Sequence, residues 1–204
     1  MKFTGDFETA TWLENETFVW AWAVCEIGSE NLTFGNSIDS FFEFCYKTKN
    51  PEILFHNLKF DGEFIIHFLL SHDFEHIEDR KNRKDKTFTT LISDMGMFYS
   101  IEVFFEVGNK KVKKVKFTDS LKIIPFSVDQ VAKSFNLEIS KLTLDYNKPR
   151  SRDHVLTDDE KAYITNDVLI MAKALNVLFK QNLTSMTQGS NALKDFKNII
   201  EKRR

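Results

Sequence analysis

The chain has 204 residues, of which 42% are hydrophobic and 28% charged, with 21 phenylalanines and three prolines. This composition predicts one soluble globular domain with a sizeable core and argues against a disordered chain. The N-terminus lacks a signal-peptide pattern, no apolar run reaches the length of a membrane span, and a net charge of −2 does not announce a nucleic-acid-binding protein.

The first predicted strand, Lys2–Thr9, carries two acids on one face. Asp6 and Glu8 are two residues apart, and side chains at this spacing leave a strand in the same direction. Two carboxylates about 5 Å apart repel by about 3 kcal/mol at an effective dielectric near 20. Such a pair suits a hard cation, which prefers carboxylate oxygens. A strand end whose acids simply point into water is the ordinary alternative for this pair taken alone.

Strands and helices alternate after this point, which predicts an α/β fold with crossover connections. Cys25 and Cys45 fall on a strand and a helix, where they are expected to be small buried residues of a reduced, cytosolic protein. The predicted elements are strands Phe18–Glu26, Asn31–Phe34 and Glu52–Asn57, a helix Ile38–Tyr46 capped by Ser37, and a helix that Asp61 opens.

The second half begins with antiparallel strands and ends with helices. The predicted strands are Phe88–Ile92, Met97–Phe105 and Val112–Phe117, and a turn at Gly108–Asn109 joins the last two. A helix from Ser127 to Phe135 and a loop from Ser140 to His154 follow. A long helix then runs from the Thr157–Glu160 capping box to about Gln181, and the last predicted helix is Asn191–Lys202.

Two further acids stand out beyond the first strand. Asp61 follows the strand that ends near Asn57, and by itself it is expected to be a helix N-cap. Asp167 lies inside the long helix, one turn after Tyr163 on the same face. Aspartate is disfavoured in helix interiors, although a solvent-facing Asp is the ordinary explanation for one such residue.

Three segments together resemble the exonuclease motifs of family B DNA polymerases. They are Asp-Phe-Glu-Thr at residues 6–9, Phe-His-Asn-Leu-Lys-Phe-Asp-Gly at 55–62 and Tyr-x-x-x-Asp at 163–167. The chain looks most similar to the protein-primed polymerases of small linear-genome phages, and the resemblance extends through residues 119–122, 145–146 and 187–190. It implies a ribonuclease H-like 3′→5′ exonuclease fold, an α/β mixed sheet flanked by helices.

The resemblance also implies a catalytic site. Asp6, Glu8, Asp61 and Asp167 would hold two Mg²⁺ or Mn²⁺ ions about 4 Å apart, one activating water and the other stabilising the leaving 3′ oxygen. Asp6 would bridge the two ions. Tyr163 would hydrogen-bond the attacking water or the scissile phosphate. Lys141 would contact that phosphate as a point charge.

A second set of residues would bind single-stranded DNA. By the same resemblance, Thr9, Asn57 and Phe60 hold the 3′-terminal nucleotide, with Phe60 stacking on its base or sugar. The positions expected to line the path of the strand are His56, Ser120, Leu121 and Tyr146. His56 and Leu121 are equally plausible as core residues.

The whole chain, residues 1–204, is expected to be one exonuclease domain, with a catalytic core at about 1–185 and a C-terminal helix in 186–204 leading toward an absent polymerase domain. The palm motifs Asp-x-x-Ser-Leu-Tyr-Pro and Tyr-x-Asp-Thr-Asp do not occur in the sequence. Expected partners are a single-stranded DNA 3′ end, a priming terminal protein and the polymerase domain of a parent chain, but no membrane. The expected location is the host cytoplasm during phage or linear-plasmid replication.

Two other functions stay open on the sequence. One is a nuclease of the same fold that trims RNA or short oligonucleotides, since no residue tests for a 2′-hydroxyl. The other is a module that binds single strands or a priming protein without cutting, although four retained carboxylates disfavour a pure phosphate binder. Basic clusters at 80–84, 110–116, 148–152 and 202–204 are individually typical of solvated surfaces. His67, His72 and His76 are expected to be surface or packing residues, not a zinc site.

Overall fold

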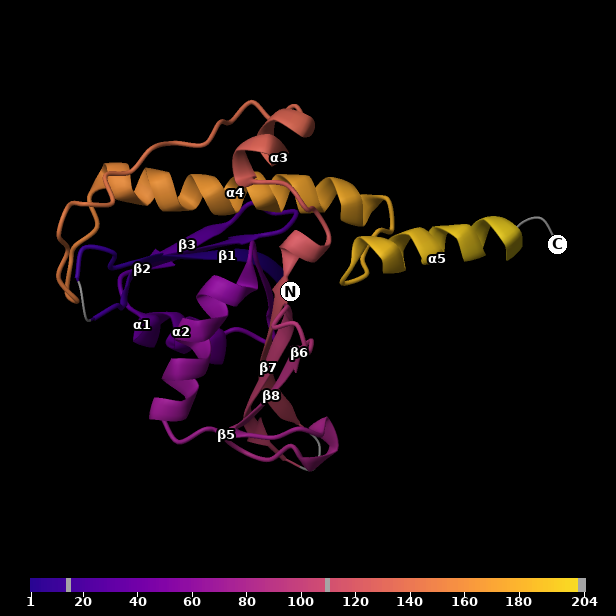
Figure 1. Ribbon diagram of the computed structural model, residues 1–204, viewed down its shortest axis with the longest axis horizontal. Helices are drawn as coiled ribbons and strands as arrows, with labels where there is room; N and C mark the ends of the chain where they lie inside the picture. The colour runs from indigo at the N-terminus through magenta and orange to yellow at the C-terminus, as the bar shows by residue number, and fades with distance from the viewer. Residues whose placement is uncertain (14–15, 109–110, 202–204) are drawn as a thin grey trace.

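The structure, a computed structural model, describes residues 1–13, 16–108 and 111–201. These residues form one mixed sheet with the strand order β3-β2-β1-β4-β8-β7-β6-β5 (Figure 1). β1, β4 and β8 run parallel in the middle, and antiparallel strands flank them on both sides. The strands are β1 (Lys2–Thr9), β2 (Val19–Glu26), β3 (Leu32–Gly35), β4 (Glu52–Phe55), β5 (Glu75–His76), β6 (Thr87–Ile92), β7 (Phe98–Val107) and β8 (Val112–Asp119). This architecture confirms the predicted α/β class with a mixed sheet flanked by helices.

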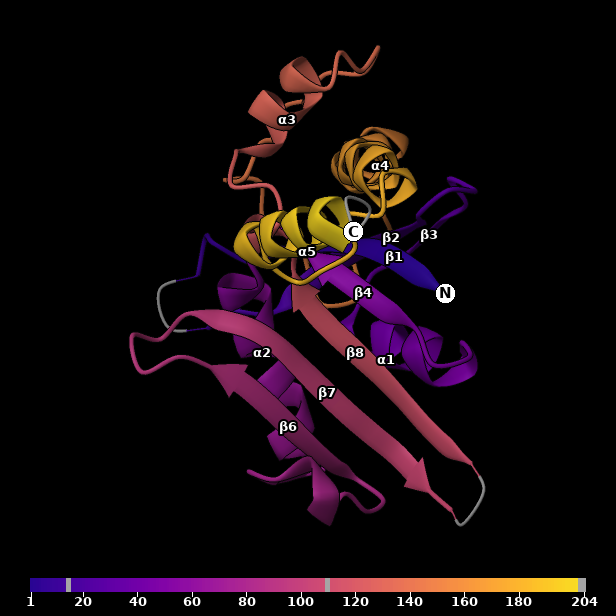
Figure 2. The same cartoon turned by 90° about the vertical axis from the view of Figure 1, so that its right-hand side faces the viewer.

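Helices cover both faces of the sheet. The helices are α1 (Ile38–Lys47), α2 (Leu58–Ser71), α3 (Val128–Ser134), α4 (Asp158–Lys180) and α5 (Gln188–Glu201), with 3₁₀ turns η1 (Arg80–Asn82) and η2 (Ser120–Lys122). α1 and α2 pack on one face with an aromatic core, and α3 and α4 pack on the other. α5 projects away from the sheet in Figure 1, and α4 is seen nearly end-on in Figure 2.

β1 shows how the sequence divides its side chains between these layers. Phe3 and Phe7 enter the core beneath α1 and α2. Thr4 points to the opposite face, where its hydroxyl donates to the Val168 carbonyl of α4 at 2.7 Å. Since side chains alternate along a strand, Asp6 and Glu8 share the face of Thr4 and are directed toward α4. A Cβ on Gly5 would lie 2.7 Å from Ile53 Cγ2, so glycine makes room for β4 beside Asp6.

Two of the predicted helix caps are confirmed. Ser37 accepts a hydrogen bond from the Ser40 backbone at the start of α1, and Thr157 with Glu160 forms the capping box that opens α4. Both cysteines are buried and free. α4 is long and apolar enough to cross a membrane by length and composition, so the expectation that no apolar run reaches that length was wrong. Half of that window is buried inside the protein, as in the core helix of a soluble protein.

The predicted start of α2 was wrong. The helix begins at Leu58, not at Asp61, and Asn57 precedes it in the left-handed region with a φ of 80°. The earlier start buries Leu58 completely, a gain that the capping pattern of Asp61 does not reveal. The two-residue strand β5 was not predicted. Asn109 of the predicted hairpin turn and Lys202 of the last helix lie outside the described residues.

Candidate active site

The four predicted acids come from three different elements and meet at one end of the sheet. Asp6 and Glu8 lie in the second half of β1, Asp61 lies in the first turn of α2, and Asp167 lies in the middle of α4. All four line or border the same pocket of about 250 Å³, where the carboxyl ends of the parallel strands β1 and β4 open to solvent. Ligands of open α/β sheets bind at such ends because the loops there leave a crevice.

Asp61 is held in this position by the neighbouring strand. Its Oδ1 accepts a hydrogen bond from the Phe7 backbone N–H at 3.2 Å, between Asp6 and Glu8 in sequence. Because α2 starts at Leu58, Asp61 is directed into the protein and is only 3% exposed. The predicted role of Asp61 as an N-cap is therefore wrong, and its carboxylate is free to act at the pocket.

The crowding of these acids raises their pKa values. Burial, with the charge of Asp167 adding to it, raises the pKa of Asp6 to about 7. Burial also raises the pKa of Glu8 to about 9, and the charges of Asp6 and Asp167 contribute. The pKa of Asp61 is raised by burial and then by Asp6. Without a bound cation, the site therefore disfavours full ionisation of its carboxyl groups.

Asp167 has one partner and one orphaned oxygen. Its Oδ2 lies 3.1 Å from Lys141 Nζ, whereas its buried Oδ1 has no hydrogen-bond partner within the described residues. Burial raises the pKa of Asp167, and Lys141 opposes this rise. A buried carboxylate oxygen without a partner is costly, so this atom is available to a ligand that brings positive charge.

This donor set fits a divalent metal. Carboxylate oxygens are the ligands that Mg²⁺ and Mn²⁺ prefer, and Asp167 Oδ1 is an unused buried one. Over residues 1–13, 16–108 and 111–201, no three Asp, Glu, His or Cys side chains converge as closely as a metal shell requires. Binding would therefore have to draw the repelling carboxylates closer together.

Two tyrosines close the other side of the pocket. Tyr163 is 3% exposed and lies one turn before Asp167 on α4, and its hydroxyl hydrogen-bonds the hydroxyl of Tyr146. Burial raises the pKa of both phenols. Both hydroxyls therefore stay protonated at neutral pH, and the one that accepts in their mutual hydrogen bond keeps its own hydrogen to donate.

Most of the predicted strand-binding residues lie at the same pocket. Thr9, His56, Asn57, Phe60 and Tyr146 line it together with the acids. Phe60 is half exposed at 50% and its ring centroid lies 5.7 Å from that of Phe64, so a flat aromatic surface is offered to solvent. The structure adds a residue not predicted from the sequence: Thr11, whose hydroxyl donates to the Tyr146 carbonyl at 3.3 Å. An isolated threonine after a strand gives no sequence pattern that would have identified it.

Ser120 and Leu121 are not brought to this pocket. Ser120 is fully buried, so its contact with a DNA strand stays a prediction. Its hydroxyl instead lies 3.1 Å from His56 Nδ1, while His56 Nε2 lies 2.6 Å from the Phe126 carbonyl. Asp119 accepts hydrogen bonds from the backbone N–H groups of Asn57 and Leu121, at 3.1 and 2.9 Å. These contacts orient the lining residues from behind.

A larger cavity, of about 480 Å³, lies elsewhere, between α1, α2 and the start of β2. It contains His67 and His72 but none of the clustered acids. His72 stacks on Phe68 with ring centroids 3.9 Å apart, in agreement with its prediction as a packing residue. We assign the chemistry to the smaller pocket because the perturbed carboxylates lie there.

Comparisons with known proteins agree with this geometry. The family model for DNA polymerase type B, organellar and viral, matches residues 43–158. The DNA polymerase of Bacillus phage Nf is 41% identical over 199 residues, which cover 97% of this chain and 34% of that protein. The DNA polymerase of Streptococcus phage Cp-1 is 33% identical over 98% of this chain and 34% of its own length. A solved structure of phi29 DNA polymerase complexed with single-stranded DNA is 38% identical, has a TM-score of 0.90, and matches over 98% of this chain and 35% of that chain. The chain thus spans about a third of the length of these relatives.

Proposed function

Because the chain belongs to the family of organellar and viral type B DNA polymerases, we propose that it forms a 3′→5′ exonuclease domain that removes nucleotides from the 3′ end of single-stranded DNA. The observation that carries this proposal is the gathering of four acids with raised pKa values, Asp6, Glu8, Asp61 and Asp167, at one open pocket. A pocket that only bound phosphate would gain affinity by losing these charges.

We assign the four acids to a site for two divalent cations, Mg²⁺ or Mn²⁺. The chemistry that such ions supply is activation of water and stabilisation of the leaving 3′ oxygen. Lys141, already paired with Asp167, contacts the scissile phosphate as a point charge. The Tyr163 hydroxyl donates a hydrogen bond to the phosphate or to the attacking water. Phe60, exposed at the mouth, stacks on the terminal base or sugar.

We further propose that the chain is part of a protein-primed phage DNA polymerase that acts in the host cytoplasm. The catalytic core covers about 1–185, and α5 leads toward a polymerase domain. The exposed apolar side chains of Leu193, Phe196 and Ile199 on α5 are suited to packing there. A priming terminal protein would be a further partner.

The test is a degradation assay on a 5′-labelled single-stranded DNA oligonucleotide with Mg²⁺. We expect a ladder that shortens from the 3′ end, stops in chelator, and is lost in Asp6→Asn but kept in the surface control Asp94→Asn. A matched RNA oligonucleotide is incubated in parallel. Faster degradation of RNA would replace the DNA assignment, and binding of DNA without any shortening would overturn the enzymatic proposal.

A further inference from the structure

The loop between α3 and α4 carries two of the assigned residues, Lys141 and Tyr146, with little regular structure to support it. In the described chain, residues 136–157 form neither helix nor strand. A loop that holds catalytic groups needs partners for its backbone, because unpaired polar groups at a buried surface are costly. Two of these partners are side chains beside the pocket: Asn166 donates to the Ser140 carbonyl at 2.8 Å, and Thr11 donates to that of Tyr146.

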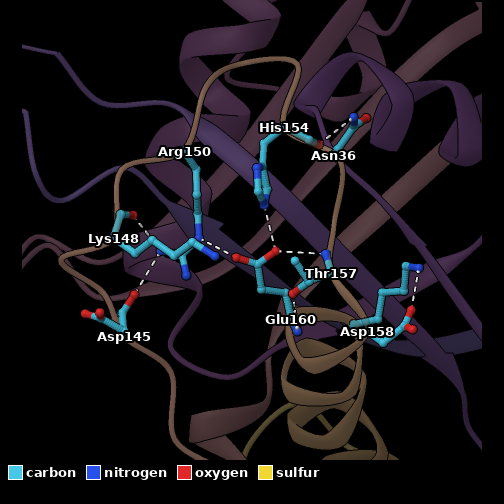
Figure 3. A network of polar contacts seen from close by, with 9 residues as sticks. Asn36, Asp145, Lys148, Arg150, His154, Thr157, Asp158 and Glu160 are labelled. Atoms are coloured by element: carbon cyan, nitrogen blue, oxygen red, sulfur yellow. Dashed lines mark hydrogen bonds and ion pairs between the residues drawn. The ribbon is translucent and has the colours of Figure 1, made fainter.

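A buried arginine supplies most of the remaining support (Figure 3). Arg150 is only 5% exposed although it stands in a basic stretch. Its Nη1 donates to the backbone carbonyls of Asp145 and Lys148, both at 2.9 Å, and so closes the loop on itself. The Asp145 carbonyl belongs to the peptide that enters Tyr146. The guanidinium lies 4.3 Å from the centre of the Trp20 ring on β2, which fixes it against the sheet.

The other side of the guanidinium is bound to α4. Arg150 Nε donates to Glu160 Oε1 at 2.8 Å. Glu160 Oε2 accepts from His154 Nε2 at 2.7 Å and from the Thr157 backbone at 3.0 Å, so both carboxylate oxygens are held. Glu160 stands three residues before Tyr163 and seven before Asp167 on the same helix. Arg150 therefore couples the path of the loop to the helix that presents the site.

We propose that Arg150 is a positioning residue, which with Glu160 clamps the loop so that Tyr146 meets Tyr163 and Lys141 meets Asp167. The proposal rests on the proposed function for its kinetic readout, but the clamp itself is observable without activity. A merely structural ion pair would affect folding and leave the folded molecules fully active. Breaking a buried pair is strongly destabilising in general, so stability alone does not distinguish the two roles.

The test compares Arg150→Lys with Glu102→Gln, a control that perturbs another buried ion pair away from the pocket. Like Glu160, Glu102 on β7 is a buried carboxylate bound by an arginine. It lies 2.7 Å from Arg80 and 2.6 Å from Lys114, but it does not line the pocket. Single-turnover hydrolysis is measured with saturating DNA and Mg²⁺, at a temperature where circular dichroism shows both variants folded. We expect at least a tenfold lower rate in Arg150→Lys and less than a twofold change in Glu102→Gln.

A double-mutant cycle then tests whether Arg150 acts through the loop. Tyr146→Phe should cost less than twofold when added to Arg150→Lys, because the tyrosine is already displaced, but should show its full effect when added to Glu102→Gln. Independent multiplication of the effects in the Arg150→Lys background would overturn the proposal. So would an unchanged rate in Arg150→Lys.

Hydrogen exchange separates a failure of the clamp from a failure of the proposed function. We expect Arg150→Lys to speed exchange of the loop amides that donate hydrogen bonds, those of Asn147, His154 and Thr157, at least tenfold. Amides in the middle of α4 should change little, and the fluorescence of Trp20 should be altered. If the wild-type protein does not degrade DNA, the proposed function fails. The hydrogen-exchange rates of the loop then still test whether Arg150 holds the loop in place. Unchanged exchange in the loop would refute it.

Discussion

Replacing Asp6 with asparagine should stabilise the protein at alkaline pH when no divalent metal is present. The folded protein holds Asp6 out of water and close to Asp167, which raises its pKa from 3.8 to about 7. A tenfold change in proton affinity is worth about 1.4 kcal/mol, so this rise corresponds to at most about 4 kcal/mol. The value is an upper limit because Asp6 and Glu8 titrate together.

The sign of the effect follows from linkage. Well below pH 3.8 the carboxyl of Asp6 is protonated in both the folded and unfolded states, so the raised pKa costs nothing. As pH rises from about 4 to about 7, the unfolded state loses the proton first and the free energy of unfolding of the wild type falls. Asparagine does not ionise. The stability advantage of Asp6→Asn should therefore be about 1 kcal/mol at pH 4.5 and about 4 kcal/mol at pH 8.5.

The measurement is urea unfolding followed by circular dichroism in EDTA at these two pH values. Asp94→Asn, at an exposed turn residue between β6 and β7, controls for the loss of one charge and should show no comparable pH-dependent gap. Mg²⁺ at about 100 times its dissociation constant should then stabilise the wild type by about 2.7 kcal/mol and Asp6→Asn by less. An Asp6→Asn protein that is less stable than wild type at pH 8.5, or a gap of equal size at both pH values, would refute electrostatic crowding as its cause.

Three further outcomes are expected. Asp6→Ala and Asp167→Ala should each lower single-turnover DNA hydrolysis by several orders of magnitude in a folded protein, and retention of more than about a tenth of the rate would exclude the two-metal assignment. Tyr163→Phe loses one hydrogen bond of roughly 1–3 kcal/mol, so its hydrolysis rate at saturating Mg²⁺ should fall about 5- to 150-fold. The midpoint of its Mg²⁺ titration should not change. A shifted midpoint with an intact saturated rate would mean that the tyrosine acts on the metal shell. A primer–template given this chain and all four deoxynucleotides should only shorten, and any extension would contradict the assignment of these residues to proofreading alone.

Elements with strong periodicity were predictable from the sequence because local pattern and tertiary burial agree there. β2 is an unbroken apolar run and is covered on both faces, and α4 opens at the capping box that its sequence contains. The start of α2 was not predictable in this way. The capping preference of Asp61 is worth about 1 kcal/mol, whereas burying Leu58 contributes roughly 1.5–3 kcal/mol, and burial depends on the rest of the fold.

The site was predictable to the extent that its residues belong to short motifs. The acids and Tyr163 fall in three such motifs, and the fold gathers them at one pocket. The burial of Ser120 was not predictable, because the η2 turn directs its hydroxyl inward, to the Phe55 carbonyl at 3.0 Å and toward His56. Sequence position gives no information on which way a turn directs one side chain.

The environment of each charged side chain was the least predictable property, because residues that look alike in sequence differ in burial. Arg150 and Arg152 belong to one basic stretch, yet Arg150 is buried on Glu160 while the side chain of Arg152 is 63% exposed. Lys141, outside the basic clusters, is the one Lys or Arg among the described residues that line the pocket, where it faces four acids. If all four ionise, the pocket carries a net charge of about −3 and repels a DNA phosphate. Attraction of a DNA end must then come from the cations that these acids bind, so the same carboxylates that destabilise the metal-free fold would control both DNA binding and hydrolysis.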